Sequence, residues 1–106
     1  MTNKNNKYNV IVSKKAAQMM VNHAAFLAKV SISAAEILVN DFEKAVSSLE
    51  DFPRRCPWLT VEYLPKHQYR SLFFGKGYLI IYQIIDSTVY VDYVVDCRED
   101  YTWLMK

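Results

Sequence analysis

Cationic and aromatic side chains occur close to the predicted strands in the C-terminal half of the chain. Arg70 lies inside one strand, whereas Arg98 and Tyr101 follow the last strand. Guanidinium groups bind phosphate, and aromatic rings stack on nucleic-acid bases. These three residues are therefore candidates for a site that acts on a nucleic acid. A plainer interpretation is also open, in which the two arginines form exposed ion pairs of little energetic value with Asp92, Asp96 or Asp100.

The charge of the chain is unevenly distributed, although its net value is only +2. The segment 53–77 is basic, with Glu62 as its single acidic residue, whereas the segment 36–51 is mainly acidic. Contact with phosphate requires a basic surface of this kind, and chance clustering on a solvated face is the alternative. The predicted contact residues are Arg54, Arg55, Lys66 and His67.

The cysteines and histidines do not indicate a metal site. Cys56 and Cys97 are far apart and belong to no ligand motif, and His23 and His67 lack the spacing of zinc ligands. We therefore expect two free thiols in a reducing compartment.

Two further patterns could hold an ion but have plainer explanations. Asp92 and Asp96 are expected on one face of the last strand, yet no oxygen-rich partner appears elsewhere. The segment Gly75-Lys76-Gly77 lies between two strands and is predicted to be a turn rather than a phosphate-binding loop. The sequence predicts no metal and no cofactor.

The N-terminal half is predicted to contain one strand and two helices. The β-branched segment 8–13 is the strand, and small apolar residues repeat at helical spacing from Lys14 to about Val30. The segment Ser33-Ala34-Ala35-Glu36 is a capping box that predicts the start of the second helix, which ends at Phe52-Pro53. Because the connection is short, the two helices are expected to be antiparallel neighbours.

The C-terminal half is predicted to be a sheet. A short strand is expected over 59–64, followed by a hairpin of 69–74 and 78–85 and a last strand over 88–95 after a turn at Asp86-Ser87. The main elements follow the order β-α-α-β-β-β in an α+β fold, with the helical hairpin on one face of a mostly antiparallel sheet. Arg98 and Tyr101 are expected to fold over the open face, near Arg70.

The length of 106 residues predicts a single domain, residues 1–106. The N-terminus has no apolar segment of the kind found in signal peptides, and the longest apolar run, LIIYQII, is too short to span a bilayer. We expect a cytoplasmic protein with no membrane partner.

Residues 69–101, YRSLFFGKGYLIIYQIIDSTVYVDYVVDCREDY, carry a pattern that resembles the RelE/ParE superfamily of bacterial toxins. The pattern is an aromatic-Arg-x-Leu strand, a Gly-bearing turn, a Tyr-led strand, a short Asp turn, an apolar strand and an Arg near an acidic residue and an aromatic. The upstream strand and helix pair match the family order too, so the resemblance extends from about Tyr8 to Tyr101. It implies a toxin of a type II toxin–antitoxin system.

The activity that the resemblance implies depends on the branch of the superfamily. RelE-like members enter the ribosomal A site and cut mRNA without a metal, by attack of a 2′-OH on the adjacent phosphate. ParE-like members instead inhibit DNA gyrase by protein–protein contact. Ribosome-dependent mRNA cleavage is the first expectation here. The alternatives are gyrase inhibition and a non-toxic homologue that only binds its antitoxin.

The resemblance also assigns roles to single residues. Arg70 would bind phosphate, Arg98 would stabilise the transition state and Tyr101 would stack on a base, with the basic segment contacting RNA. RNA-cutting members often carry an Arg at the position of Leu79, whereas Leu is common there in ParE-like sequences. The alternatives for a general base stay open among Glu62, Lys66 and His67.

The implied partners are a cognate antitoxin and a cellular target. An extended or helical antitoxin segment, acidic in character, would bind the open sheet face and the helical hairpin. The target would be the ribosome with its mRNA, or DNA gyrase.

Overall fold

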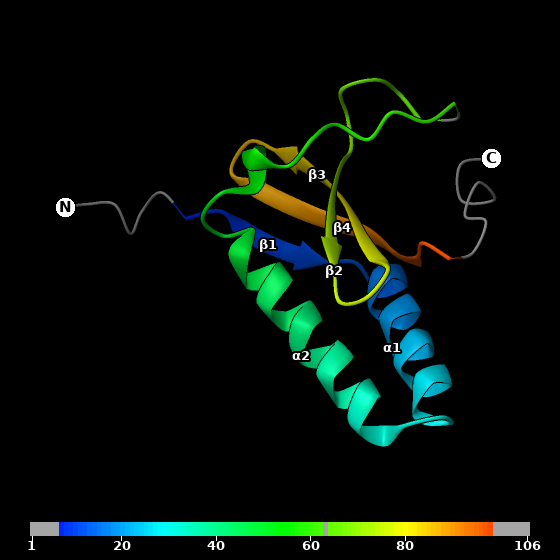
Figure 1. The fold of residues 1–106 in the computed structure, drawn as a ribbon. Coiled ribbons are helices and arrows are strands. Elements are labelled where there is room, and N and C mark those ends of the chain that lie inside the picture. The colour runs from blue at the N-terminus through cyan, green and yellow to red at the C-terminus, as the bar shows by residue number, and fades with distance from the viewer. Residues whose placement is uncertain (1–6, 63, 99–106) are drawn as a thin grey trace.

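Two helices and a four-stranded sheet make up the part of the chain that this computed structural model describes, residues 7–62 and 64–98 (Figure 1). The strand order is β1-β4-β3-β2; β1 runs parallel to β4, and the other pairs are antiparallel. In chain order the elements are β1 (Asn9–Val12), α1 (Lys14–Ala28), α2 (Ile32–Ser48), the short 3-10 helix η2 (Pro53–Arg55), β2 (Arg70–Phe74), β3 (Tyr78–Ile85) and β4 (Thr88–Asp96).

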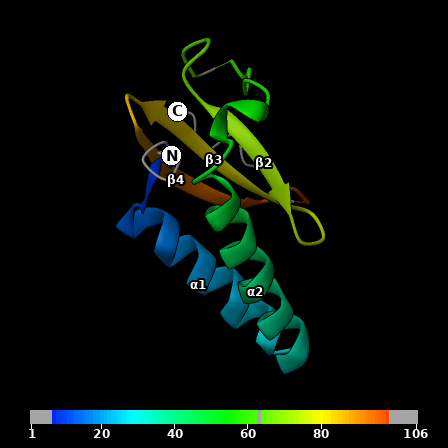
Figure 2. The ribbon, with the colours of Figure 1, turned by 90° about the vertical axis from the view of Figure 1, so that its left-hand side faces the viewer.

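The helices form an antiparallel pair on one face of the sheet, as Figures 1 and 2 show. α1 packs against β4 and α2, and α2 also contacts β2. The core between the layers contains Ala16, Met20 and Leu38 from the helices, and Ile80 and Val91 from the sheet. This arrangement confirms the predicted α+β architecture. Within the described residues, neither helix is long and apolar enough to cross a membrane.

A serine side chain caps the N-terminus of each helix. Ser13 Oγ accepts a hydrogen bond from the amide of Ala16 (3.0 Å), and Ser31 Oγ accepts one from the amide of Ala34 (3.1 Å). The predicted capping box at Ser33 is therefore wrong, because Ser33 already lies in the first turn of α2. α1 ends at Ala28, two residues earlier than expected, so the chain turns sooner and Ser31 reaches the capping position.

The hairpin between β2 and β3 is confirmed. Gly75 and Gly77 both have positive φ angles, +58° and +95°, which residues without a Cβ adopt at little cost. The next turn contains Asp86 at φ 56°, in the left-handed region that Asp tolerates. These turns place β2, β3 and β4 next to one another as consecutive antiparallel strands.

No strand forms over residues 59–62 or at residue 64, which corrects the predicted strand over 59–64. Among the described residues, its backbone is joined to the start of the hairpin at one point, where the amide of Leu59 donates to the carbonyl of Tyr69, just before β2 (2.7 Å). Pro57 and Pro65 flank the segment and lack the amide donors that a longer ladder needs.

The side chains of this segment still pack on the sheet, on the face away from the helices. Leu59, Val61 and Leu64 contact the cluster of Leu79, Ile81 and Val95. The face that was expected to be open is therefore partly covered.

A buried hydrogen bond ties the middle of the sheet to η2. The hydroxyl of Tyr82, which is fully buried, donates to the carbonyl of Pro53 (2.6 Å). Burial raises the pKa of this hydroxyl well above its ordinary value of 10, so it stays a neutral donor.

Replacing Tyr82 with Phe should lower the free energy of unfolding by about 1–2 kcal/mol, because the Pro53 carbonyl loses its buried donor while the ring keeps its packing. Urea unfolding at pH 7 measures the change. Tyr90→Phe is the matched control, since no hydrogen bond of the Tyr90 hydroxyl is found among the described residues, and it should cost less than about 0.5 kcal/mol. Equal stability of Tyr82→Phe and the original protein would contradict this role.

Candidate functional site

Arg98 is positioned by the end of the β4 ladder. The amide of Cys97 donates to the carbonyl of Gly77 (2.7 Å), which fixes the chain after β4 beside the β2–β3 turn. The aliphatic stem of Arg98 then lies beside Gly77.

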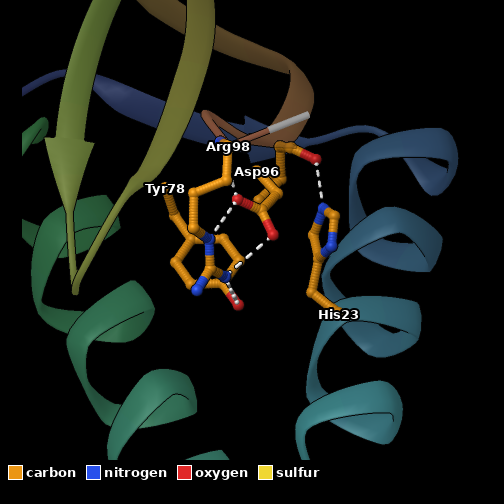
Figure 3. Close-up of polar contacts among 5 residues, drawn as sticks. His23, Tyr78, Asp96 and Arg98 are labelled. Atoms are coloured by element: carbon orange, nitrogen blue, oxygen red, sulfur yellow. Dashed lines mark hydrogen bonds and ion pairs between the residues drawn. The ribbon is translucent and has the colours of Figure 1, made fainter. Parts of the chain in front are cut away.

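The guanidinium of Arg98 is held by two side chains (Figure 3). Its Nε and Nη2 donate to the two carboxylate oxygens of Asp96, both at 2.8 Å, and Nη2 also donates to the hydroxyl of Tyr78 (3.0 Å). The hydrogen bonds from Arg98 lower the pKa of the Asp96 carboxyl below its ordinary value of 3.8. The Arg98 side chain remains 63% exposed, so an oriented cation faces solvent.

His23 completes this cluster from α1. Its Nε2 lies 2.8 Å from the carbonyl of Val94, which can only accept, so Nε2 must carry the proton. The ring meets that of Tyr78 edge to face, with 5.4 Å between centroids. No local sequence pattern marks the hydrogen bond of His23, because Val94 lies 71 positions away along the chain.

An apolar pocket of about 230 Å³ opens beside Arg98. Leu27 of α1 and Ala34, Ile37 and Leu38 of α2 form its apolar wall, and Ile37 is 60% exposed. The polar rim consists of Asp41, Lys76, Tyr78 and Arg98. The pocket is smaller than typical small-ligand sites of about 300–1,000 Å³ and suits a single side chain of a protein partner.

Arg70 lies at the start of β2, at the end of the β2–β3 ladder away from the turn. It pairs with Tyr82, whereas Arg98 contacts Tyr78, and four strand residues correspond to about 13 Å at roughly 3.3 Å per residue. Arg70 also shares the helix-side face of β2 with Leu72 and Phe74, both of which pack in the main core. The expectation that Arg98 joins Arg70 on the open face is therefore wrong. The Cys97–Gly77 hydrogen bond directs Arg98 to the turn instead.

The predicted phosphate-contact residues separate into two groups. Arg54, Lys66 and His67 line a second pocket together with Arg70. Arg55 instead turns back to the end of α2, where it donates to the carbonyl of Phe52 (2.8 Å) and to Ser48 Oγ (3.0 Å). Tyr101 lies outside the described residues. The RNA-binding and catalytic roles expected for these residues stay predictions.

The two acidic residues of β4 do not share a face, contrary to expectation. Ile81 pairs with Tyr93 and Tyr82 with Val91, so Asp92 is an extra residue that forms a β-bulge. Asp92 accepts from Gln83 (2.7 Å), whereas Asp96 lies with Arg98 near the helices. In the described part of the chain, no group of three or more His, Cys, Asp or Glu residues could hold a metal ion.

Leu79 is a core residue of the sheet. The side chain of Leu79 is 3% exposed and packs with Ile81 and Val95. An exposed catalytic cation is therefore not available at this position.

The described chain thus has a helical hairpin on one face of a mixed four-stranded sheet, and an arginine is held in place just after the last strand. The sequence model of one family, "ParE toxin of type II toxin-antitoxin system, parDE", matches residues 10–101, and the chain belongs to this family. Family membership implies a cognate antitoxin.

A solved structure supports the fold independently. The "Chromosomal ParDE TA system from P. aeruginosa" contains a chain that superimposes with a TM-score of 0.67, covering 86% of this chain and 97% of that one. The identity is 11%, so the likeness concerns the fold alone. No curated protein matches the sequence.

Asp96→Asn should lower the free energy of unfolding by about 1 kcal/mol at pH 7, because Arg98, whose side chain is mostly exposed, loses its charged partner. The folded-state pKa of Asp96 is lowered, so its contribution is present above pH 3.8 and is lost as the pH falls through the folded pKa. The difference between the two proteins should therefore shrink towards pH 3.

Urea unfolding from pH 7 to pH 3 measures this trend. Asp86→Asn is the control, since Asp86 is exposed in a turn and takes part in no ion pair within the described ranges. A constant, pH-independent deficit for Asp96→Asn would refute the assigned interaction.

Proposed function

We propose that this toxin acts by binding a protein target, DNA gyrase, and not by cutting mRNA. The resemblance connects ParE-like sequences with gyrase inhibition, and the chain belongs to the ParE family. The cytoplasmic location expected from the sequence is part of this proposal, because gyrase and the antitoxin are found there.

The observation that carries the proposal is the geometry of Arg98. Its guanidinium is fixed by Asp96 and Tyr78 yet exposed, and it borders an apolar pocket that includes the exposed Ile37. Arginines held in place beside apolar pockets are typical anchors of protein interfaces, since little entropy is lost when they bind. The face of the protein near the β2–β3 turn is therefore the proposed contact with gyrase.

Cleavage of mRNA has less support from the described residues. It requires positive charges that converge on one phosphate, whereas Arg70 and Arg98 lie at opposite ends of the β2–β3 ladder. Leu79 is buried where RNA-cutting members often carry an Arg. Cleavage by Arg70, Arg98 and Tyr101 nevertheless stays the alternative prediction, and the same experiment tests it.

The outer side of the two helices provides a surface that suits an antitoxin segment. A groove of about 900 Å³ runs between α1 and α2, and Val21, Ile32 and Val39 expose apolar surface along it. Glu36 and Glu43 are its charged residues. We propose that a helical antitoxin segment binds here through apolar contacts. Because the charged residues of the groove are acidic, it does not favour binding of the acidic antitoxin segment that was expected from the sequence.

The purified toxin should inhibit DNA supercoiling by gyrase and leave translation of a reporter mRNA intact in a cell-free system. Arg98→Ala should weaken the inhibition at least tenfold, which corresponds to about 1.4 kcal/mol of lost contact energy. Lys44→Ala, an exposed cation of α2 outside the pocket, should stay within twofold. Cutting of ribosome-bound mRNA that is abolished by Arg98→Ala, with normal supercoiling, would establish the alternative.

Val21→Glu should weaken binding of the antitoxin at least tenfold, because it places a charge in the apolar contact and beside the acidic lining. The antitoxin is expected from a small neighbouring reading frame, and titration calorimetry measures its affinity. Phe52→Glu changes an exposed aromatic outside the groove and should bind normally. Unchanged binding by Val21→Glu would exclude the groove as the antitoxin site.

A further inference from the structure

A second pocket lies at the end of β2 and β3 remote from Arg98. It has a volume of about 380 Å³, and its lining contains four residues that are or can become cationic: Arg54, Lys66, His67 and Arg70. These residues come from three separate segments: η2, the loop that follows it and the start of β2. The fold therefore gathers them at one place.

Trp58 is the fixed element around which the pocket is built. A single antiparallel bridge joins Trp58 to Arg70, and the amide of Ser71 donates to the carbonyl of Pro57 (3.3 Å). The Arg70 guanidinium stacks 3.8 Å from the centroid of the Trp58 ring. His67 meets the same ring edge to face at 5.4 Å.

The orientation of Arg70 leaves donors available. Its Nη1 donates to the carbonyl oxygens of Arg54 (3.2 Å) and Cys56 (2.6 Å). Hydrogen bonds from Nε and Nη2 are not found within residues 7–62 and 64–98. Because two carbonyls and an indole hold the plane of the guanidinium, these remaining donors point in a fixed direction.

The charges around this pocket are not compensated. Its lining contains no carboxylate, and Arg54, Lys66 and Arg70 take part in no ion pair with the described residues. Arg98 differs in this respect, because Asp96 neutralises it. Like charges brought together repel one another, and an anion bound between them would relieve that repulsion.

The chemistry of the lining favours a phosphate over a carboxylate. A phosphate offers three acceptor oxygens and up to two negative charges, which match several cations better than one carboxylate does. The pocket also has apolar contacts for a base: Trp58, which is 41% exposed, and Ile84 and Ile85 of β3. Its volume falls in the range of about 300–1,000 Å³ that small-ligand sites occupy.

We propose that this pocket binds the phosphate of a nucleotide, either free or within a single strand, and that Trp58 contacts the base. No bond is made or broken. The proposal does not depend on gyrase inhibition, which concerns the opposite end of the sheet.

Nuclear magnetic resonance titration tests the proposal on the full chain with two probes, 5′-AMP and a single-stranded DNA tetranucleotide. Binding should shift the Trp58 indole signal and the amides of residues 66–70, with dissociation constants of about 1 mM or below, and should weaken as salt is raised. Binding of 5′-AMP alone indicates a phosphomonoester site, binding of the strand alone a phosphodiester site, and binding of both a site that accepts either phosphate. Each of these results supports the proposal.

Lys66→Glu and Lys44→Glu form a matched pair. Both replace an exposed lysine with the same charge change, but only Lys66 lines the pocket. Lys66→Glu should weaken nucleotide binding at least tenfold, whereas Lys44→Glu should stay within twofold.

Three results would overturn the proposal. The first is the absence of shifts at Trp58 and residues 66–70 with either probe. The second is equal binding of adenosine, which has no phosphate. The third is binding of a tetraglutamate peptide to the same residues as tightly as the nucleotides, which would assign the pocket to an acidic protein segment.

Discussion

The first five residues of β3, Tyr78–Tyr82, are buried, and antiparallel ladders hold the strand on both sides. Such a strand needs apolar cover on each face of the sheet. The two helices cover one face, and the apolar side chains of the loop before β2 cover the other. The buried half of β3 is thereby closed to polar partners. The candidate surfaces described above lie where the strands end and on the outer side of the helices.

The two ends of the sheet differ in how their charges are balanced. Near the β2–β3 turn, Asp96 neutralises Arg98, and the neighbouring pocket is mostly apolar. Near η2, the cations around Trp58 have no carboxylate in the pocket lining. An apolar surface with one oriented charge suits a protein partner, whereas uncompensated charge suits a polyanion. The described part of the chain therefore has two surfaces with different binding chemistry.

Local patterns in the sequence predicted most of the fold. Helical spacing, the Gly-bearing turn and the apolar run of β3 gave the correct elements, because each depends on neighbours in the chain. One error is local, since the cap of α2 is Ser31 and not Ser33. Most of the other errors concern distant contacts. The partnership of His23 with Val94 and the separation of Arg70 from Arg98 depend on strand register, which no short pattern encodes. The segment 59–64 looked like a strand because apolar residues that cover a sheet resemble those that belong to one.

The bulge at Asp92 has a consequence for comparing relatives. Along a regular strand, side chains alternate between the two faces of the sheet, and the extra residue shifts this alternation by one position. Val91 and Val94 therefore face the same core although they are three positions apart. A relative without this extra residue would continue the ladder without interruption and keep its equivalents of Asp96 and Arg98 in place. An alignment that omits a one-residue gap here would exchange inward and outward positions throughout half of the strand, and would misassign the very residues that face a partner.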